Sequence, residues 1–223
     1  MSLLEIKDLY IDYKTDDADV HAVNGLDLTL EKGECLGLVG ETGAGKTSTA
    51  LGILRLLPTP QGKYLGGSIL FNDIPLLEIG DAAMRDIRGK CISMIFQDPM
   101  TALNPSMTIG SQIAEAVLVH EPKISKDALR ARVLELMELV EIDRPMERMK
   151  LYPHNFSGGM RQRAVMAIAL AARAKILLAD EPTTALDVTI QAQILDLLRD
   201  IQEKLHTATI LVSHDLGVVA RAA

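Results

Sequence analysis

The sequence predicts an α/β fold built on a parallel sheet, with an antiparallel β part and a helical insert. Short apolar runs alternate with stretches of helical periodicity in much of the chain, which is typical of parallel strands joined by helices. Before residue 31, apolar residues recur at about every second position, as in half-buried strands. From residue 108 to 173 helical spacing takes over, so this middle third is predicted to be the insert.

The predicted elements begin with two strands of two-residue period near the N-terminus. Their apolar positions are Leu4, Ile6, Leu9, Ile11, Tyr13, Leu26, Leu28 and Leu30. The run from Cys35 to Val39 is then predicted to be a fully buried strand. It leads through a glycine-rich turn into a helix expected over residues 46–57, which Pro58 would end. Shorter strands are expected at 68–71 and 91–96.

Helices make up the insert, and strands return after it. Helices are expected at about 108–119 and 158–173, on either side of a third whose apolar residues lie at helical spacing. These residues are Leu129, Val133, Leu136, Met137 and Val140. Strands are predicted at 176–179 and 208–212, with an amphipathic helix between them. Residues 216–223 have the pattern of a helix start without a stop signal, so we expect a fragment truncated at its C-terminus.

The composition is that of a folded globular domain. Its 223 residues include 23 Lys and Arg, 30 Asp and Glu, and 48% hydrophobic residues. The longest apolar run, residues 164–172, is too short to predict a membrane span, and the acidic first residues do not fit a signal peptide. Cys35 and Cys91 lack the spacing of a disulfide framework or a zinc site. A net charge of −7 with 3% aromatic residues argues against bulk nucleic-acid binding but is compatible with a local basic patch.

A phosphate-binding loop is the most specific motif in the sequence. Residues 40–47 fit G-x-x-x-x-G-K-[ST], with a predicted strand before and a helix after the motif. The glycines let successive N–H groups converge on phosphate oxygens at a helix start. Lys46 would reach the β- and γ-phosphates, and the Thr47 hydroxyl would bind Mg²⁺. The candidate nucleotide-binding residues here are Gly40, Glu41, Thr42, Gly43, Ala44, Gly45, Lys46, Thr47 and Ser48.

An acidic pair at the end of a predicted strand supplies the other groups that a phosphate site needs. Asp180 and Glu181 directly follow the apolar run 176–179. In open α/β sheets ligands bind at the carboxyl ends of the strands, where this pair is expected to lie. We predict that Asp180 is a Mg²⁺ partner and that Glu181 is the general base for an attacking water.

Further segments resemble the conserved motifs of the ABC ATPases. Residues 157–163, Ser-Gly-Gly-Met-Arg-Gln-Arg, are similar to the signature motif of that family. Gln97 lies in a segment similar to the Q-loop, residues 185–187 resemble the D-loop, and His214 is placed like the switch histidine. Tyr13 is similar in placement to the aromatic residue that stacks on adenine. The resemblance extends over nearly the whole chain.

This resemblance implies a nucleotide-binding domain over residues 1–223 with a P-loop NTPase, RecA-like core. Residues 1–100 and 174–223 would form the α/β core with its β subdomain, and 101–173 a helical subdomain. It implies ATP and Mg²⁺ as cofactors and a head-to-tail dimer, in which ATP on one subunit's loop contacts Ser157, Gly158 and Gly159 of the other. His214 would hold the γ-phosphate, and Gln97 would sense the nucleotide and contact the metal.

Finer features are similar to the ATP-binding subunits of dipeptide, oligopeptide and nickel importers. They include Ala102-Leu103-Asn104-Pro105 and Tyr152-Pro153-His154. Met160 departs from the Gln found in most relatives, but the signature helix start retains Ser157 and two glycines. The resemblance implies a peripheral subunit at the cytosolic face of a membrane, with permease subunits, a second ATPase subunit and, indirectly, an extracellular or periplasmic solute-binding protein as partners.

Two alternatives remain from the sequence. The chain would be an ABC ATPase that acts on nucleic acid or ribosomes if the helical insert met nucleic acid instead of a permease; the net charge disfavours this. If the chain stops at Ala223, it would lack strands that follow the switch histidine in relatives, and would be an ATP-binding fragment with little turnover.

Overall fold

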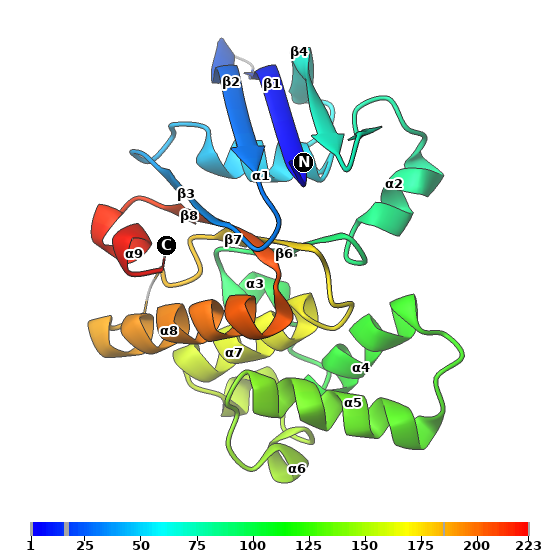
Figure 1. The fold of residues 1–223 in the computed structure, drawn as a ribbon. Coiled ribbons are helices and arrows are strands. Elements are labelled where there is room, and N and C mark those ends of the chain that lie inside the picture. The colour runs from blue at the N-terminus through cyan, green and yellow to red at the C-terminus, as the bar shows by residue number, and fades with distance from the viewer. Residues whose placement is uncertain (1, 16–17, 185, 223) are drawn as a thin grey trace.

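The computed structural model of the chain describes residues 2–15, 18–184 and 186–222, and its strands form two sheets (Figure 1). The antiparallel sheet has the order β2-β1-β4-β5, with β1 (Leu4–Lys14), β2 (Asp19–Leu30), β4 (Gly62–Phe71) and β5 (Ile74–Pro75). The other sheet is parallel, in the order β3-β8-β7-β6. Its strands are β3 (Cys35–Val39), β6 (Ile92–Ile95), β7 (Ile176–Asp180) and β8 (Ala208–Ser213).

The helices of the structure are concentrated in the middle and the last part of the chain. They are α1 (Lys46–Ile53), α2 (Asp81–Ile87), α3 (Pro99–Ala102), α4 (Ile109–His120), α5 (Lys126–Leu139), α6 (Pro145–Arg148), α7 (Gly158–Ala169), α8 (Val188–Leu205) and α9 (Leu216–Ala222), with a 3₁₀ turn at Pro153–Asn155. None of these helices, within the residues that the structure describes, is long and apolar enough to span a membrane. The two sheets and the run of helices between β6 and β7 confirm the predicted parallel sheet, antiparallel β part and helical insert.

The parallel sheet lies between two hydrophobic cores because its strands alternate their side chains. On β7, Ile176 and Leu178 join the core beneath the antiparallel sheet, whereas Leu177 and Ala179 join the core of the helical region. All five residues of β7 are buried, which is typical of a strand covered on both faces. Figure 1 shows the antiparallel sheet above the parallel strands and the helices α4 to α8 below them.

Side-chain caps fix where the long helices begin. Thr108, Ser125, Ser157 and Asp187 each accept a hydrogen bond from a backbone N–H in the first turn of α4, α5, α7 and α8, respectively. The helix starts at 108 and 158 therefore agree with the sequence prediction. The far end of the second differs, since α7 ends at Ala169 and the predicted helix ran to residue 173.

The strand from Cys35 to Val39 is not fully buried as predicted. Each residue of β3 has intermediate exposure, because β3 lies at the edge of the sheet and pairs only with β8 among the described strands. An apolar run of five residues has no feature that distinguishes an edge position from a central one.

Helix α1 ends at Ile53, four residues before the predicted end. Arg55 adopts a left-handed backbone conformation with φ of 51°. The Leu56 N–H donates to Leu51 O, and the Arg55 N–H to Gly52 O, which are the two bonds of a Schellman motif. Arg55 is held there because its guanidinium donates to Ile79 O at 2.6 Å. The stop is therefore made by a Schellman motif at Arg55, which a tertiary contact supports, and not by Pro58.

Strand β4 begins at Gly62, earlier than the predicted strand at 68–71. Strand β1 pairs with it over most of that length, so the pairing extends the strand beyond its apolar part. The turn after it, Asn72-Asp73, has positive φ at both residues, 46° and 64°, as tight hairpins require.

Replacement of Leu178 by Ala tests the sandwiched position of β7. Leu178 has no solvent exposure, so we expect the variant to lower the free energy of unfolding by about 2–5 kcal/mol in urea titrations. Leu65→Ala is the control, since Leu65 is 61% exposed and should change this free energy by less than about 0.5 kcal/mol. Similar losses for both variants would contradict the assignment of β7 to the centre of the fold.

Candidate functional site

The glycine-rich loop between β3 and α1 has a backbone that only glycine adopts easily. Gly43 and Gly45 have φ of 85° and 82°. A Cβ atom on Gly45 would lie 1.9 Å from the carbonyl oxygen of Ala22 on β2, so the loop packs directly against the antiparallel sheet. Gly45 is the N-cap of α1 and offers no side chain to the first amides of the helix. These amides and the helix dipole suit an anion.

Lys46 is held over this loop. Only 6% of the residue is exposed, and its Nζ donates to the carbonyl oxygens of Gly40 and Glu41, both at 2.8 Å. The ammonium group therefore lies among the backbone groups that the motif predicts as the phosphate cradle.

Thr47 and Asp180 connect this loop to the end of β7. The Thr47 hydroxyl donates to Asp180 Oδ1 at 3.0 Å, across 133 residues of sequence. Burial raises the pKa of the Asp180 carboxyl, and the nearby Glu181 raises it further, while the Thr47 hydrogen bond and Lys46 act to lower it. A hydroxyl and a buried carboxylate are hard oxygen ligands of the type that Mg²⁺ prefers. Thr47 and Asp180, two of the three residues predicted to contact the metal, thus lie together, and their oxygens fit Mg²⁺.

Glu181 is held in an uncommon backbone conformation next to this pair. Its φ is 44°, in the left-handed region, and its N–H donates to Val212 O on β8 at 3.0 Å. Such conformations persist only where the surrounding structure fixes them, and they are common at functional sites. Here the strained backbone turns the chain directly after the buried Asp180.

Three side chains converge on one carboxylate oxygen, Oε2 of Glu181. Gln97 Nε2 and Thr184 Oγ1 each donate to it at 2.9 Å, and His214 Nδ1 lies 3.4 Å from it. The structure therefore brings together Gln97, Glu181 and His214, which the sequence placed far apart. It adds Thr184, which the sequence analysis missed. The available signal was a hydroxyl residue three positions after the predicted base.

Glu181 lies between two small cavities. One, of about 180 Å³, is lined by the glycine-rich loop from Thr42 to Ser48, by Gln97 and by Glu181. The other, of about 260 Å³, is lined by Glu181, Thr184, His214 and the start of the last helical segment. Glu181 thus contributes to the lining of both the loop-side and the histidine-side cavity.

The second predicted anion site, at the start of α7, faces neither cavity. Ser157 caps the helix, its hydroxyl accepting from the Met160 N–H at 3.4 Å. A Cβ atom on Gly159 would lie 2.6 Å from Ile190 of α8, so this glycine also allows the two helices to pack closely. Ser157, Gly158 and Gly159 line neither cavity beside Glu181. Within one chain the structure does not bring them to the glycine-rich loop.

Tyr13 is not brought to the loop either. It lies on β1, where it pairs with Val20 and Gly62, and its partly buried ring packs against the core beneath the antiparallel sheet. A cavity of about 300 Å³ between β2 and Lys46 does not include it. Ala185 of the segment that resembles the D-loop lies outside the described residues, whereas Asp187 of that segment caps α8.

The chain matches the ABC transporter family over residues 23–184. It is 54% identical to the oligopeptide transport ATP-binding protein OppD of Bacillus subtilis over 221 residues, which are 99% of this chain and 62% of that protein. It is 53% identical to the dipeptide transport ATP-binding protein DppD of the same organism, covering 99% of this chain and 66% of DppD. The chain thus spans less than two thirds of the length of these relatives.

Solved structures agree with this match. The ATP-binding cassette MJ0796, solved as a dimer in a post-hydrolysis state with ADP and Pi, superposes with a TM-score of 0.85 at 26% identity, covering 98% of this chain and 90% of that chain. A structure of cbiO1 from Clostridium perfringens, described as part of the ABC transporter complex cbiONQ, gives a TM-score of 0.82 at 26% identity, with 98% and 80% coverage.

The burial of Asp180 is expected to lower the stability of the folded protein at neutral pH. Because burial raises its pKa, the folded state binds a proton more readily than the unfolded state, and stability falls as the pH rises above the ordinary Asp value near 3.8. We therefore expect Asp180→Asn to melt a few degrees higher than the wild type at pH 7, and the difference to shrink as the pH falls toward 4. Asp86→Asn on the exposed side of α2 is the control. A lower melting temperature for Asp180→Asn at pH 7 would contradict the stated pKa direction.

Proposed function

The chain belongs to the ABC transporter family, and we propose that it is the ATP-binding subunit of an importer of peptides or similar small solutes, nickel included. The observation that carries this proposal is the position of Glu181 beside the glycine-rich loop, next to the Thr47–Asp180 pair. The names of two relatives that are 54% and 53% identical over the 221 aligned residues support the peptide branch.

In the proposed reaction, water attacks the γ-phosphate of ATP and ADP leaves. The loop amides and Lys46 bind the phosphates, and Glu181 accepts the proton of the attacking water. Thr47 and Asp180, with Gln97 nearby, would hold Mg²⁺, which neutralises the charge of the phosphate oxygens when bound. His214 would orient the water and the γ-phosphate. The predicted contact of Tyr13 with the base rests on the family resemblance alone, since Tyr13 packs against the core beneath the antiparallel sheet. These roles are proposals that rest on the placement of the residues and on the family.

A second subunit would complete the site. Ser157, Gly158 and Gly159 form an anion-binding helix start that the loop of the same chain does not reach. We propose that they contact ATP bound to a partner ATPase subunit, identical or related, in a head-to-tail pair. The dimeric state of MJ0796 supports this arrangement.

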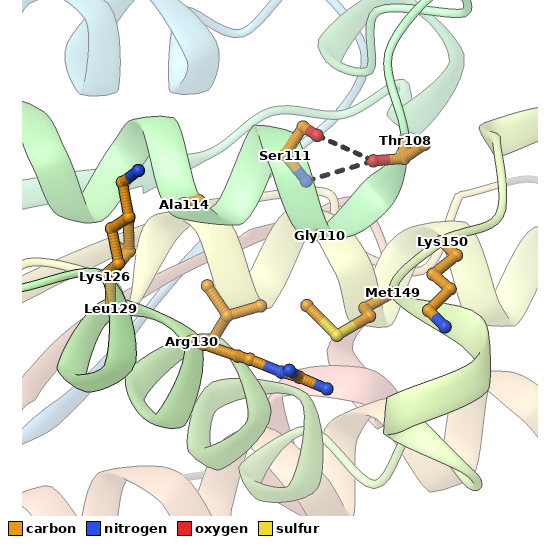
Figure 2. A pocket seen from close by; sticks show the side chains of 10 residues that line it. Thr108, Gly110, Ser111, Ala114, Lys126, Leu129, Arg130, Met149 and Lys150 are labelled. Atoms are coloured by element: carbon orange, nitrogen blue, oxygen red, sulfur yellow. Dashed lines mark hydrogen bonds between the residues drawn. The ribbon is translucent and has the colours of Figure 1, made fainter.

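The helical subdomain, residues 101–173, carries a groove that suits a permease. A cavity of about 540 Å³ lies between α4 and α5, with Ala114, Leu129, Val133 and Met149 in its apolar lining (Figure 2). Its charged residues are all cations, Lys126, Arg130 and Lys150, and no described residue forms an ion pair with any of the three. By contrast, Arg132, two residues from Arg130, pairs with Glu135.

We propose that this groove receives an acidic, amphipathic segment of the permease. Apolar side chains would enter the groove between α4 and α5, and carboxylates would meet the three cations. The subunit would then lie peripherally at the cytosolic face of the membrane, and a solute-binding protein would be an indirect partner. Residues 1–100 and 174–223 would form the other subdomain, which carries the phosphate loop.

Substitution of Glu181 and Lys46 tests the ATPase proposal. We expect Glu181→Gln to retain ATP binding, to lower the rate of phosphate release by at least about 10²-fold, and to trap an ATP-bound dimer in gel filtration. Lys46→Ala should instead weaken ATP binding itself, measured by titration with a fluorescent ATP analogue. Unchanged turnover in Glu181→Gln would remove Glu181 from the role of base. An inactive wild type that still binds ATP would identify a binding-only fragment.

Charge reversal in the groove tests the permease proposal. The probe is a pair of permease subunits of a bacterial oligopeptide importer, co-expressed with the chain and captured by a tag on the permease. We expect Arg130→Glu to lower the captured amount about tenfold, because it places a like charge against the acidic segment. Lys204→Glu, at an exposed position of α8, should leave capture unchanged. If the permease captured Arg130→Glu and Lys204→Glu in equal amounts, or if the chain bound RNA in place of the permease, the proposal that the groove receives a permease segment would be contradicted.

A further inference from the structure

The Glu181 carboxylate uses its two oxygens differently. Oε2 receives the hydrogen bonds from Gln97 and Thr184 and lies beside His214. Oε1 has no hydrogen-bond partner among the residues that the structure describes. The side chain of Glu181 is only 13% exposed, so its orientation depends on these few partners. One oxygen is therefore fixed, and the other is free to take up a proton.

Among the partners of Oε2, Thr184 is the nearest in sequence and the most firmly placed. Its N–H donates to Glu181 O at 3.1 Å and its hydroxyl to Glu181 Oε2 at 2.9 Å, so it binds both the backbone and the side chain of the same residue. Gln97, by contrast, follows β6 in a loop, and its bond to Oε2 is exposed. His214 is 57% exposed. Of the three residues beside Oε2, Thr184 is the one whose backbone is bonded to Glu181, in the turn that begins at Glu181.

We propose that Thr184 is a positioning residue that holds the Glu181 carboxylate through Oε2 and leaves Oε1 as the oxygen that accepts the proton of the attacking water. The inference rests on the proposed function, because it assigns the geometry of the proposed base. The hydroxyl acts through Glu181 and does not contact the nucleotide. Loss of the hydroxyl would let the carboxylate rotate about its side-chain torsions, so fewer of the bound complexes would have a correctly aligned base.

Valine is the informative replacement at this position, since it keeps the branched shape of threonine and removes only the hydroxyl. We expect Thr184→Val to lower kcat for ATP about ten- to a hundredfold, the order of one lost hydrogen bond to a charged carboxylate, with KM for ATP unchanged within about twofold. Thr184→Ser retains the donor and should keep kcat within about twofold of the wild type. Recovery by serine would show that the hydroxyl is what matters.

The neighbouring threonine supplies a matched control. Thr183 is buried and lines the same cavity as the partly buried Thr184, but its hydroxyl makes no hydrogen bond to Glu181. Thr183→Val should therefore leave kcat within about twofold of the wild type. Equal losses of kcat in the two valine variants, a rise in KM for Thr184→Val, or failure of Thr184→Ser to recover kcat would overturn the proposal.

A crystal structure of the Thr184→Val variant tests the positioning without any activity. The expected result is a Glu181 side chain in a second rotamer, with Oε2 displaced from Gln97. A carboxylate that stays in place would overturn the positioning role, even in a protein with no ATPase activity. In a wild type that hydrolyses no ATP, the proposed function fails, while this readout still decides whether Thr184 fixes the carboxylate.

Discussion

The parallel alignment of β3, β7 and β8 is the constraint on which the candidate site depends. Because these strands run in the same direction in adjacent positions, their carboxyl ends deliver the glycine-rich loop, the Asp180–Glu181 pair and His214 to one edge of the sheet. The bond between Thr47 and Asp180 then ties the start of α1 to the end of β7. Burial of β7 in two cores makes this edge rigid, since its side chains are covered on both faces.

The sequence could predict those parts of the site that local chemistry specifies. The spacing of the glycines and the lysine is enough to identify the glycine-rich loop. The acidic pair is identified by its position directly after an apolar run that is predicted to be a strand. Both predictions place residues that the structure brings together. The same local information also predicted the starts of α4 and α7, where the structure shows Thr108 and Ser157 forming cap hydrogen bonds within one helical turn.

Other features depend on contacts between segments that are distant in the sequence, and local sequence patterns do not predict such contacts. The exposure of β3 follows from its place at the edge of the sheet, and the early end of α1 from the contact of Arg55 with Ile79. The hydrogen bond from Thr184 to Glu181 depends on the left-handed backbone of Glu181, which turns the chain so that Thr184 faces the Glu181 side chain. The sequence does not specify this backbone conformation. Tyr13 resembles in its sequence position the aromatic residue that stacks on adenine. In the structure it lies on β1, which pairs with β4, and it packs against the core beneath the antiparallel sheet.

Glu181 and Ile190 lie near the two regions that are predicted to bind anions. At one end, Glu181 lies beside the phosphate loop; at the other, Ile190 packs closely against Gly159, next to the capped start of α7. Leu186, between them, lies against Gly158. These contacts leave little space for α7 to move relative to α8, since interiors packed at this density do not deform freely.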